Sequence, residues 1–426
     1  MSIHAAVAAI ISSRLTSAAR EEKRRRSAER ERRGRGDPHL VRAFIDVADP
    51  YSFLLSQLLP ALAERYAIAL QFHLVPTPQA AAAPDASRLA AWSRRDCTLL
   101  AARAGLMDIG CEPDDAAFAH AQRLLATAIA CTDAPQRVAA ILASLWRGAP
   151  FPDGTTGDAD ASMAAGAAAL QQAGHYLGGV AAYGGESYWG VDRLHYLEAR
   201  LHALGLARDA NQTPLFAPPP DMAAPANANG GDVHWFLSFR SPYTWLAAPR
   251  IARLTAAHGA KLHLRFVLPM VMRALPVPRE KRRYIVMDCA REARRLGIPF
   301  GKIVDPVGKP VERGYAILHH AIAAGRGLEF ALAFLEGVWA KGLDAGSDRG
   351  LARITTNAGL DWAEMRRHLD EDGWRAVAEG NRQTMLGGGL WGVPSFAVGN
   401  AGGDQFFWGQ DRLWAVDAAL RNPALT

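Results

Sequence analysis

The two halves of the chain repeat the same short motifs, and this repeat limits the fold more than any other feature. The motif DPYSFL at residues 49–54 aligns with SPYTWL at residues 241–246, and Asp96-Cys97 aligns with Asp288-Cys289, each 192 residues apart. Near the ends of the halves, WGVDRL at residues 189–194 aligns with WGQDRL at residues 408–413, now 219 residues apart, so the second half carries 27 additional residues. A solenoid unit spans roughly 20–50 residues, so this longer repeat predicts a duplicated domain.

Each half has the same predicted order of elements. A β-rich run leads through a Pro turn into an apolar helix, and a second strand, a long helical stretch and a closing strand–Gly turn–strand–helix follow. The first two strands are predicted at residues 41–47 and 67–75, and again at 233–239 and 261–268. Strand–helix–strand implies a parallel pair with a right-handed crossover, and the closing pieces predict an antiparallel hairpin. We therefore predict an α/β chain of two tandem thioredoxin-like domains, each with an all-helical insertion.

The chain is predicted to have four parts. They are a basic N-terminal arm at residues 1–37, a first domain at 38–213, a Pro/Ala-rich linker at 214–231 and a second domain at 232–426. The linker contains three consecutive prolines and is too polar and too broken for a packed element.

The basic arm carries the whole net charge. The chain has a formal net charge of +6, and residues 1–36 hold ten Lys or Arg and four Glu, so the remaining residues are neutral. Residues 17–33 place Glu four residues before Arg three times, which favours a helix, but they offer little apolar face. We predict a solvated helix or a disordered arm, with contact to nucleic acid or to an anionic membrane as the alternatives. For the neutral body no nucleic-acid partner is expected.

Targeting, membrane and metal signals are weak. No stretch reaches the roughly 18 apolar residues that span a bilayer, so no transmembrane segment is expected. The apolar run at residues 5–11 precedes its positive charges, the reverse of a secretory signal, and the arm's glutamates argue against a transit peptide. The four cysteines form no C-x-x-C pair, so neither a zinc site nor a dithiol is expected and no metal is predicted. We expect a cytoplasmic protein.

Two pieces of the second half could form the centre of a site. The segment SPYT at residues 241–244 follows the first strand, so Ser241 is placed beside the unpaired N–H groups of a helix, where an anion such as a thiolate is stabilised. The alternative is a plain N-cap with Pro at the next position. A cis bond before Pro394 would turn the backbone of Val393 outward, toward an extended peptide ligand. The alternative is a Pro that begins an edge strand.

Two further pieces add charge. A turn precedes the last helix and contains Trp408, Gly409, Gln410 and Asp411. Backbone N–H groups at this turn could hold a carboxylate, and Asp411 could pair with an ammonium. Together these groups suit an amino-acid head group. Arg273, Lys281 and Tyr284 are candidates for binding an anionic substrate, as they lie at or near the first helix of the insertion. Simple capping and a solvated helix face remain the alternatives.

The four pieces occur together, in this order, in a known family. From about residue 232 to residue 420, the second half resembles the 2-hydroxychromene-2-carboxylate isomerases and the related kappa-class glutathione transferases, which belong to the DsbA-like branch of the thioredoxin fold. The resemblance covers nearly all of that half. It implies a DsbA-like domain and a glutathione-dependent enzyme that acts on a small aromatic-derived substrate.

The resemblance also implies roles for individual residues. Ser241 matches the serine whose hydroxyl stabilises the glutathione thiolate, and Val393 matches the backbone contact to the cysteinyl unit just before the cis-proline, Pro394. Gln410 and Asp411 match the residues that hold the γ-glutamyl head. In the isomerase reaction the thiolate adds to a conjugated carbon and opens the ring, and glutathione is expelled after bond rotation.

The same resemblance leaves alternatives open. Arg273 falls near a basic residue of the family that faces the substrate. Family members commonly dimerise, so the fused halves could form an internal pseudo-dimer, or the chain a homodimer. A kappa-like transferase would use the same glutathione site, and a non-catalytic thioredoxin-fold binding protein is the remaining alternative. A thiol–disulfide oxidoreductase is disfavoured because Ser241 and Thr244 occupy both dithiol positions.

The first half keeps the scaffold but lacks these groups. Asp49 stands in the place of the serine, His175 in the place of the cis-proline and Val191 in the place of the glutamine. A carboxylate would repel a thiolate, so we predict a degenerate and inactive first domain. The alternative is that Asp49 supports a different reaction.

Overall fold

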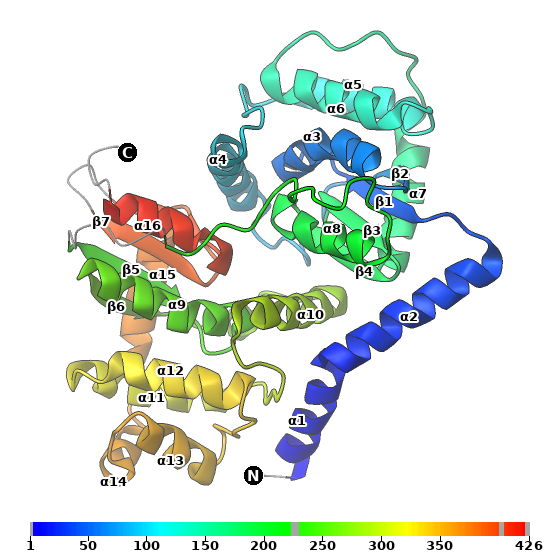
Figure 1. Ribbon diagram of the computed structural model, residues 1–426. Helices are drawn as coiled ribbons and strands as arrows, with labels where there is room; N and C mark the ends of the chain where they lie inside the picture. Colours follow the sequence, from blue (N-terminus) through cyan, green and yellow to red (C-terminus); the bar gives the residue numbers. More distant parts are fainter. Residues whose placement is uncertain (1–2, 223–229, 400–403, 422–426) are drawn as a thin grey trace. The chain divides into compact units, whose positions relative to one another are not determined.

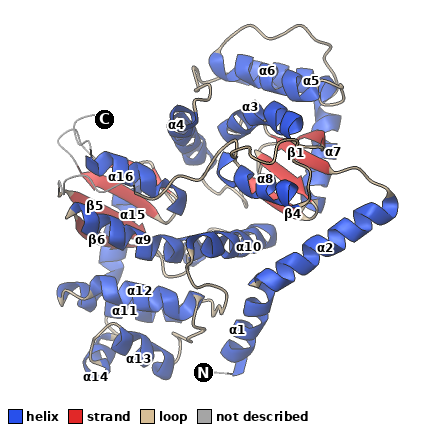
Figure 2. Ribbon diagram, in the orientation of Figure 1, coloured by secondary structure: helices blue, strands red, loops and turns tan. Residues whose placement is uncertain are grey.

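The computed structural model describes residues 3–222, 230–399 and 404–421, so the middle of the predicted linker, residues 223–229, lies outside the described residues. The chain divides into two compact units, and each holds a four-stranded sheet (Figures 1 and 2). The C-terminal unit comprises Met1–Glu21, Pro219–Val277 and Ile285–Thr426, and the N-terminal unit comprises Glu22–Pro218 and Pro278–Tyr284. Each unit therefore contains a short segment from the other half of the sequence.

The N-terminal unit has the predicted strand pattern. Strands β1 (Leu40–Ile45) and β2 (Ala69–Leu74) are parallel and joined through helix α3 (Pro50–Arg65), while β3 (Val180–Tyr183) and β4 (Glu186–Trp189) add antiparallel pairs in the order β2-β1-β3-β4. The connection from β2 to β3 is helical. It comprises α4 (Ala86–Ala104), α5 (Asp115–Ala128), α6 (Ala134–Arg147) and α7 (Ala159–Gln172), and after β4 come the 3-10 helix η1 (Val191–Arg193) and α8 (Leu194–Ala203).

The side chains of a strand alternate between the two faces of a sheet. In this sheet, apolar side chains on both faces are covered by helices. Val41, Ala43 and Ile45 lie in the main core with apolar residues of α3, α4, α5, α6 and α8. On the other face, Phe44 packs in a smaller cluster with Leu170 of α7. The all-helical insertion thus contributes to both layers.

The C-terminal unit repeats the layout with added helices. Its sheet has the order β6-β5-β7-β8, in which β5 (Asp232–Leu237) and β6 (Lys261–Phe266) are parallel and β7 (Ser395–Gly399) and β8 (Gln405–Trp408) are antiparallel. Helix α9 (Pro242–His258) is the crossover, and the chain closes with the 3-10 helix η4 (Gln410–Arg412) and α16 (Leu413–Arg421). The insertion comprises η2 (Met270–Arg273), α10 (Arg279–Leu296), α11 (Lys309–Ala323), α12 (Gly327–Trp339), α13 (Asp348–Asn357), α14 (Trp362–Met365), η3 (Arg366–His368) and α15 (Trp374–Gly387).

The strand registers correct one predicted equivalence. Phe44 pairs with Val180 in the first sheet and Phe236 pairs with Ser395 in the second, so the residue before Val180, Gly179, corresponds to Pro394. The turn confirms this, because Gly190 N–H donates to Gly179 O at 2.8 Å, as Gly409 N–H donates to Pro394 O at 2.9 Å. His175 therefore does not occupy the cis-proline position; it lies four residues earlier.

Gly179 is required where it stands. Its φ is +64°, a left-handed conformation that residues with a Cβ rarely adopt. A Cβ atom there would lie 2.9 Å from Oδ2 of Asp49. At this position the first half thus has a residue that lets the carboxyl group of Asp49 approach the backbone.

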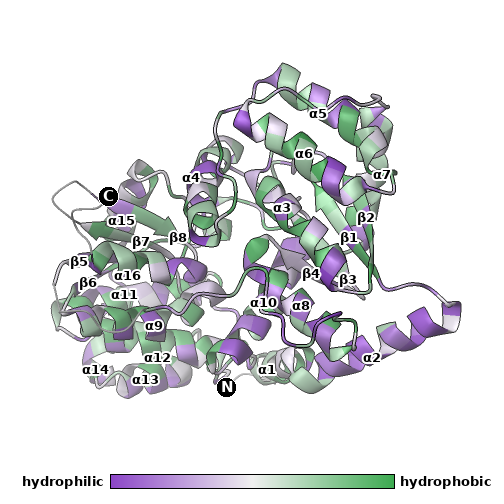
Figure 3. Cartoon of the chain, turned by 45° about the horizontal axis from the view of Figure 1, so that its top comes forward, coloured by the Kyte–Doolittle hydropathy of each residue, from purple (hydrophilic) through white to green (hydrophobic). Residues whose placement is uncertain are grey.

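The basic arm forms two helices, α1 (Ile3–Thr16) and α2 (Ala18–Arg35). The predicted solvated helix is confirmed for α2, which is strongly hydrophilic and has no buried residue (Figure 3), whereas α1 buries Ala5, Ala9 and Thr16. In the C-terminal unit, Ser12 Oγ of α1 accepts a hydrogen bond from Ile303 N–H at 2.9 Å. In the N-terminal unit, Arg25 of α2 donates two hydrogen bonds to the carboxylate of Glu186, at 2.7 and 2.8 Å.

The pairing inside α2 is also partly different from the prediction. Arg26 and Glu22 form the expected pair, at 3.7 Å, but Glu29 pairs with Arg32, at 3.1 Å, and accepts a hydrogen bond from the Tyr183 hydroxyl. Helix α2 is thus an exposed helix that ion pairs and hydrogen bonds hold to the N-terminal unit. None of the described helices combines the length and apolar composition needed to cross a bilayer.

Candidate active site of the C-terminal unit

Ser241 begins the crossover helix α9 and contacts the loop before β7. Its Oγ accepts a hydrogen bond from Thr244 N–H at 3.2 Å, and Pro242 takes the first helical position, so the predicted N-cap is present. The hydroxyl donates its proton to the backbone oxygen of Val393, at 3.3 Å. Ser241 therefore lies at the positive end of a 17-residue helix, beside the loop that it was predicted to meet.

The Val393–Pro394 peptide bond is cis, as predicted. Pro394 directly precedes β7, and its carbonyl accepts from Gly409 N–H, which brings the turn after β8 to the same place. Among the described residues, Val393 N–H has no hydrogen-bond partner. An extended backbone could therefore pair with this N–H.

Trp408 packs tightly against the loop before Pro394. A Cβ atom at Gly392 would lie 2.2 Å from Cζ2 of the Trp408 indole, so only glycine fits under this ring. Trp391 meets the same indole edge-on, with ring centroids 5.2 Å apart. The structure thus brings Ser241, Val393, Pro394, Trp408 and Gly409 together.

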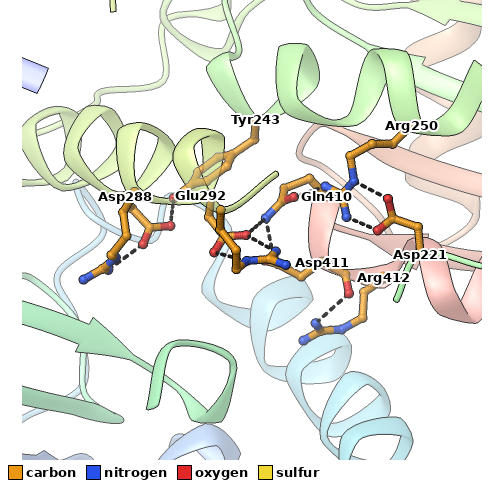
Figure 4. A network of polar contacts seen from close by, with 10 residues as sticks. Asp221, Tyr243, Arg250, Asp288, Glu292, Gln410, Asp411 and Arg412 are labelled. Carbon is orange, nitrogen blue, oxygen red and sulfur yellow. Dashed lines mark hydrogen bonds and ion pairs between the residues drawn. The ribbon is translucent and has the colours of Figure 1, made fainter. Parts of the chain in front are cut away.

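Gln410 does not present an open side chain. It is buried, its Oε1 accepts a hydrogen bond from Arg250, and its Nε2 donates to Glu292 Oε2 at 2.9 Å and to Oδ1 of Asp411 (Figure 4). Both amide protons are therefore used within the protein. Asp411 is partly exposed and is oriented by this contact.

The network around Gln410 contains residues that sequence reasoning missed. Arg250 of α9 also donates to Asp221 (Figure 4). Arg295 donates to Glu292 at 2.9 Å. Buried charges are stable only when paired and hydrogen-bonded, and each charge in this network has such a partner. A sequence signal existed for Arg250 alone, as one of two arginines, with Arg253, in a largely apolar helix.

The repeated Asp-Cys motif has a structural role in both units. Tyr243 donates from its hydroxyl to Asp288 Oδ2 at 2.8 Å, and Tyr51 donates to Asp96 Oδ2 at 2.7 Å. In each unit this bond joins the first turn of the crossover helix to the first long helix of the insertion. Asp288 also accepts from Arg291 at 2.7 Å.

The three predicted substrate-binding residues belong to two different units. Arg273 ends η2, is partly buried, and its Nε has no hydrogen-bond partner among the described residues. Burial, and then the charge of Arg382, lower the pKa of Arg273. The contacts of Lys281 and Tyr284 lie in the N-terminal unit instead.

Lys281 donates from Nζ to Ala82 O at 2.8 Å, and burial lowers the pKa of Lys281 to about 8. Tyr284 packs against the ring of His175, with centroids 4.5 Å apart. Both residues belong to the segment Pro278–Tyr284, which is part of that unit. That they bind the substrate stays a prediction.

The N-terminal unit has carboxyl groups at the corresponding place. Asp49 caps α3 by accepting from Tyr51 N–H at 3.1 Å, and burial raises the pKa of Asp49 to about 6. Burial, and then the charge of Asp49, raise the pKa of Asp46 to about 7. A carboxyl group thus stands where Ser241 offers a hydroxyl in the C-terminal unit.

Comparisons with known proteins agree with this fold. Residues 232–421 match the family model described as a DSBA-like thioredoxin domain. This part of the chain is a DsbA-like thioredoxin domain. The predicted fold is thus confirmed for the second half, and the N-terminal unit has a similar layout of sheet and helices.

Individual relatives resemble the DsbA-like domain at low identity. The 2-hydroxychromene-2-carboxylate isomerase of Pseudomonas putida is 22% identical over 196 residues, which are 44% of this chain and 93% of that protein. A solved 2-hydroxychromene-2-carboxylate isomerase is 20% identical with a TM-score of 0.39 and covers 45% of this chain and 95% of its own. The cytosolic disulfide reductase DsbM from Pseudomonas aeruginosa is 20% identical with a TM-score of 0.36, at 45% and 95% coverage.

Proposed function

We propose that the DsbA-like domain is a glutathione-dependent isomerase of the 2-hydroxychromene-2-carboxylate isomerase type. The observation that carries this proposal is the position of the Ser241 hydroxyl, at the N-terminus of α9 and 3.3 Å from the backbone oxygen of Val393. The distant homology to the Pseudomonas putida isomerase supports the same activity.

The residues at this site fit the sulfur end of glutathione. The Ser241 hydroxyl has one proton, and turning it away from Val393 O gives up only one long hydrogen bond. That proton and the helix N-terminus would then both favour a thiolate. The unpaired Val393 N–H would hold the cysteinyl backbone. When bound, glutathione would supply a nucleophilic thiolate that adds to a conjugated carbon of the substrate and later leaves.

The other end of glutathione requires a change in one predicted role. Gln410 is committed to Arg250, Glu292 and Asp411, so we propose that it positions Asp411 rather than binding the γ-glutamyl head itself. The partly exposed Asp411 carboxylate would hold the ammonium group. Arg273, with an unpaired Nε, would attract the carboxylate of an aromatic-derived substrate.

We also propose that the two halves arose by duplication and that the N-terminal unit has lost the glutathione chemistry. The shared strand order, the matching registers and the paired Tyr–Asp bonds support a common origin. The carboxyl group of Asp49 and the glycine at position 179 account for the loss.

Calorimetric titration of the full-length protein with glutathione tests the proposal. We expect one binding site per chain, weaker binding in Ser241→Ala and unchanged binding in Ser347→Ala, because Ser347 is also a helix N-cap, on α13, outside the site. Absence of binding at millimolar glutathione would refute the proposed function. If 2-hydroxychromene-2-carboxylate is converted, full recovery of free glutathione identifies an isomerase, whereas its consumption identifies a transferase.

A further inference from the structure

Three potential metal ligands converge on the helical insertion of the C-terminal unit. His320 lies near the end of α11, His368 ends η3, and Glu371 follows three residues later. His320 Nε2 lies 2.8 Å from Glu371 Oε2, and His368 Nδ1 lies 2.6 Å from Glu371 Oε1. Across the described part of the chain, this is the one group of three such side chains whose ligand atoms lie within 4.8 Å of one another.

The geometry is close to that of a coordination shell. Nitrogen and oxygen ligands lie about 2.0–2.2 Å from zinc, so two ligands of one ion are at most about 4.4 Å apart. The three side chains are partly or fully exposed, so small rotations can bring their ligand atoms within reach of one ion. Two imidazoles and a carboxylate suit zinc and neighbouring transition metals, whereas magnesium and calcium prefer oxygen alone.

The arrangement of the three groups also suits a cation. The two oxygens of the Glu371 carboxylate each face one imidazole nitrogen. The two imidazole rings are stacked with centroids 3.7 Å apart, so their nitrogens lie on the same side as the carboxylate.

The position of the cluster determines which segments a bound ion would join. In the N-terminal unit, residues 148–158 join α6 to α7, whereas in the C-terminal unit residues 340–373 separate α12 from α15. This extra segment contains α13, α14 and η3, and it supplies two of the three ligands. The third ligand comes from α11, so a bound ion would tie the extra segment to the shared part of the insertion.

We propose that His320, His368 and Glu371 bind one divalent transition-metal ion of the zinc class. Three protein ligands leave a fourth position for water. The sequence offered no signal for this site, because His320 lies 51 residues before Glu371 and no cysteine is involved.

The test uses full-length protein without an affinity tag, stripped with EDTA and titrated with Zn²⁺ and with Co²⁺. We expect one equivalent of Zn²⁺ to bind, a visible Co²⁺ spectrum typical of nitrogen and oxygen ligands, and a higher melting temperature with Zn²⁺. In His368→Ala and in Glu371→Gln, affinity should fall by more than the ~10–100-fold caused by losing a partner outside the coordination shell.

Two controls separate this site from others. His319→Ala removes the neighbouring histidine and should bind Zn²⁺ like the unaltered protein. Cys131→Ser removes an exposed free thiol and should also leave binding unchanged. Lack of saturable binding would show a hydrogen-bonded surface cluster only. Undiminished binding in Glu371→Gln, or loss of binding in Cys131→Ser, would equally overturn the proposal.

Discussion

Replacing Ser241 with alanine should raise the pKa of the thiol of bound glutathione. A hydrogen bond to a charged group contributes about 1.5–3 kcal/mol, and one pKa unit corresponds to 1.36 kcal/mol. Loss of the Ser241 hydroxyl should therefore raise the thiol pKa by about 1–2 units. The helix N-terminus remains in the variant, so part of the stabilisation of the thiolate should persist.

The same substitution also removes a helix cap. Thr244 N–H loses its acceptor, and such a loss costs about 1 kcal/mol of stability. Ser347→Ala is the matched control, since Ser347 caps α13 by accepting from Gly350 N–H at 3.1 Å. The free energy of unfolding should fall by a similar amount in both variants, but only Ser241→Ala should raise the pKa of the glutathione thiol.

The assay is a pH titration of the ultraviolet thiolate absorbance of the glutathione complex. Each variant is first tested for folding by circular dichroism and for its free energy of unfolding in urea. If the thiol pKa in Ser241→Ala equals that of the unaltered protein, Ser241 is a helix cap only. If Ser347→Ala raises the thiol pKa by as much as Ser241→Ala, the shift is caused by general destabilisation of the protein.

Three further outcomes are expected. Burial alone would raise the pKa of Glu186, but the hydrogen bond from Arg25 and the charges of Arg200 and Arg25 lower this pKa from 4.5 to about 2. The ionised carboxylate therefore stabilises the folded protein above pH 4.5, and this stabilisation is lost as the pH falls toward 2. Urea unfolding of Glu186→Gln should therefore show a loss of up to ~3 kcal/mol at pH 7 that shrinks at pH 3; an equal loss at both pH values would contradict this. Gly392→Ala should displace the Trp408 indole, change its fluorescence and weaken glutathione binding, whereas Gly387→Ala, with open space at its Cβ, should do neither. Gln410→Ala should lower the free energy of unfolding by about 1–3 kcal/mol through unpaired buried groups, and loss of binding without loss of stability would show direct recognition instead.

The sequence predicted the parts of the fold that depend on local pattern. The strand order and the cap at Ser241 follow from alternating apolar residues, Pro turns and the repeated motif, all of which are read within a few residues. The grouping of Ser241, Val393 and Gly409 follows from the topology, since a parallel pair and a hairpin bring these segments to one end of the sheet.

Predictions that depended on distant partners were less reliable. The pairing rule for residues four apart cannot show that Arg25 has a stronger partner in Glu186, far along the chain. In the same way, Gln410 lies in a motif whose pattern suits ligand binding, yet three segments supply partners that bury it. The cis-proline position in the first half was misplaced because that segment has no proline, and only strand register identifies Gly179.

The exchange of segments between the units bears on how the protein is made. The C-terminal unit includes Met1–Glu21 and the N-terminal unit includes Pro278–Tyr284, so each draws on both halves of the sequence. During synthesis, α1 is made before the residues near 300 that it contacts, such as Arg294 and Ile303. The N-terminal unit, in turn, lacks its last segment until the linker and β5 have been made. Cutting the gene at the linker would separate α1 and the start of α10 from the units that they complete.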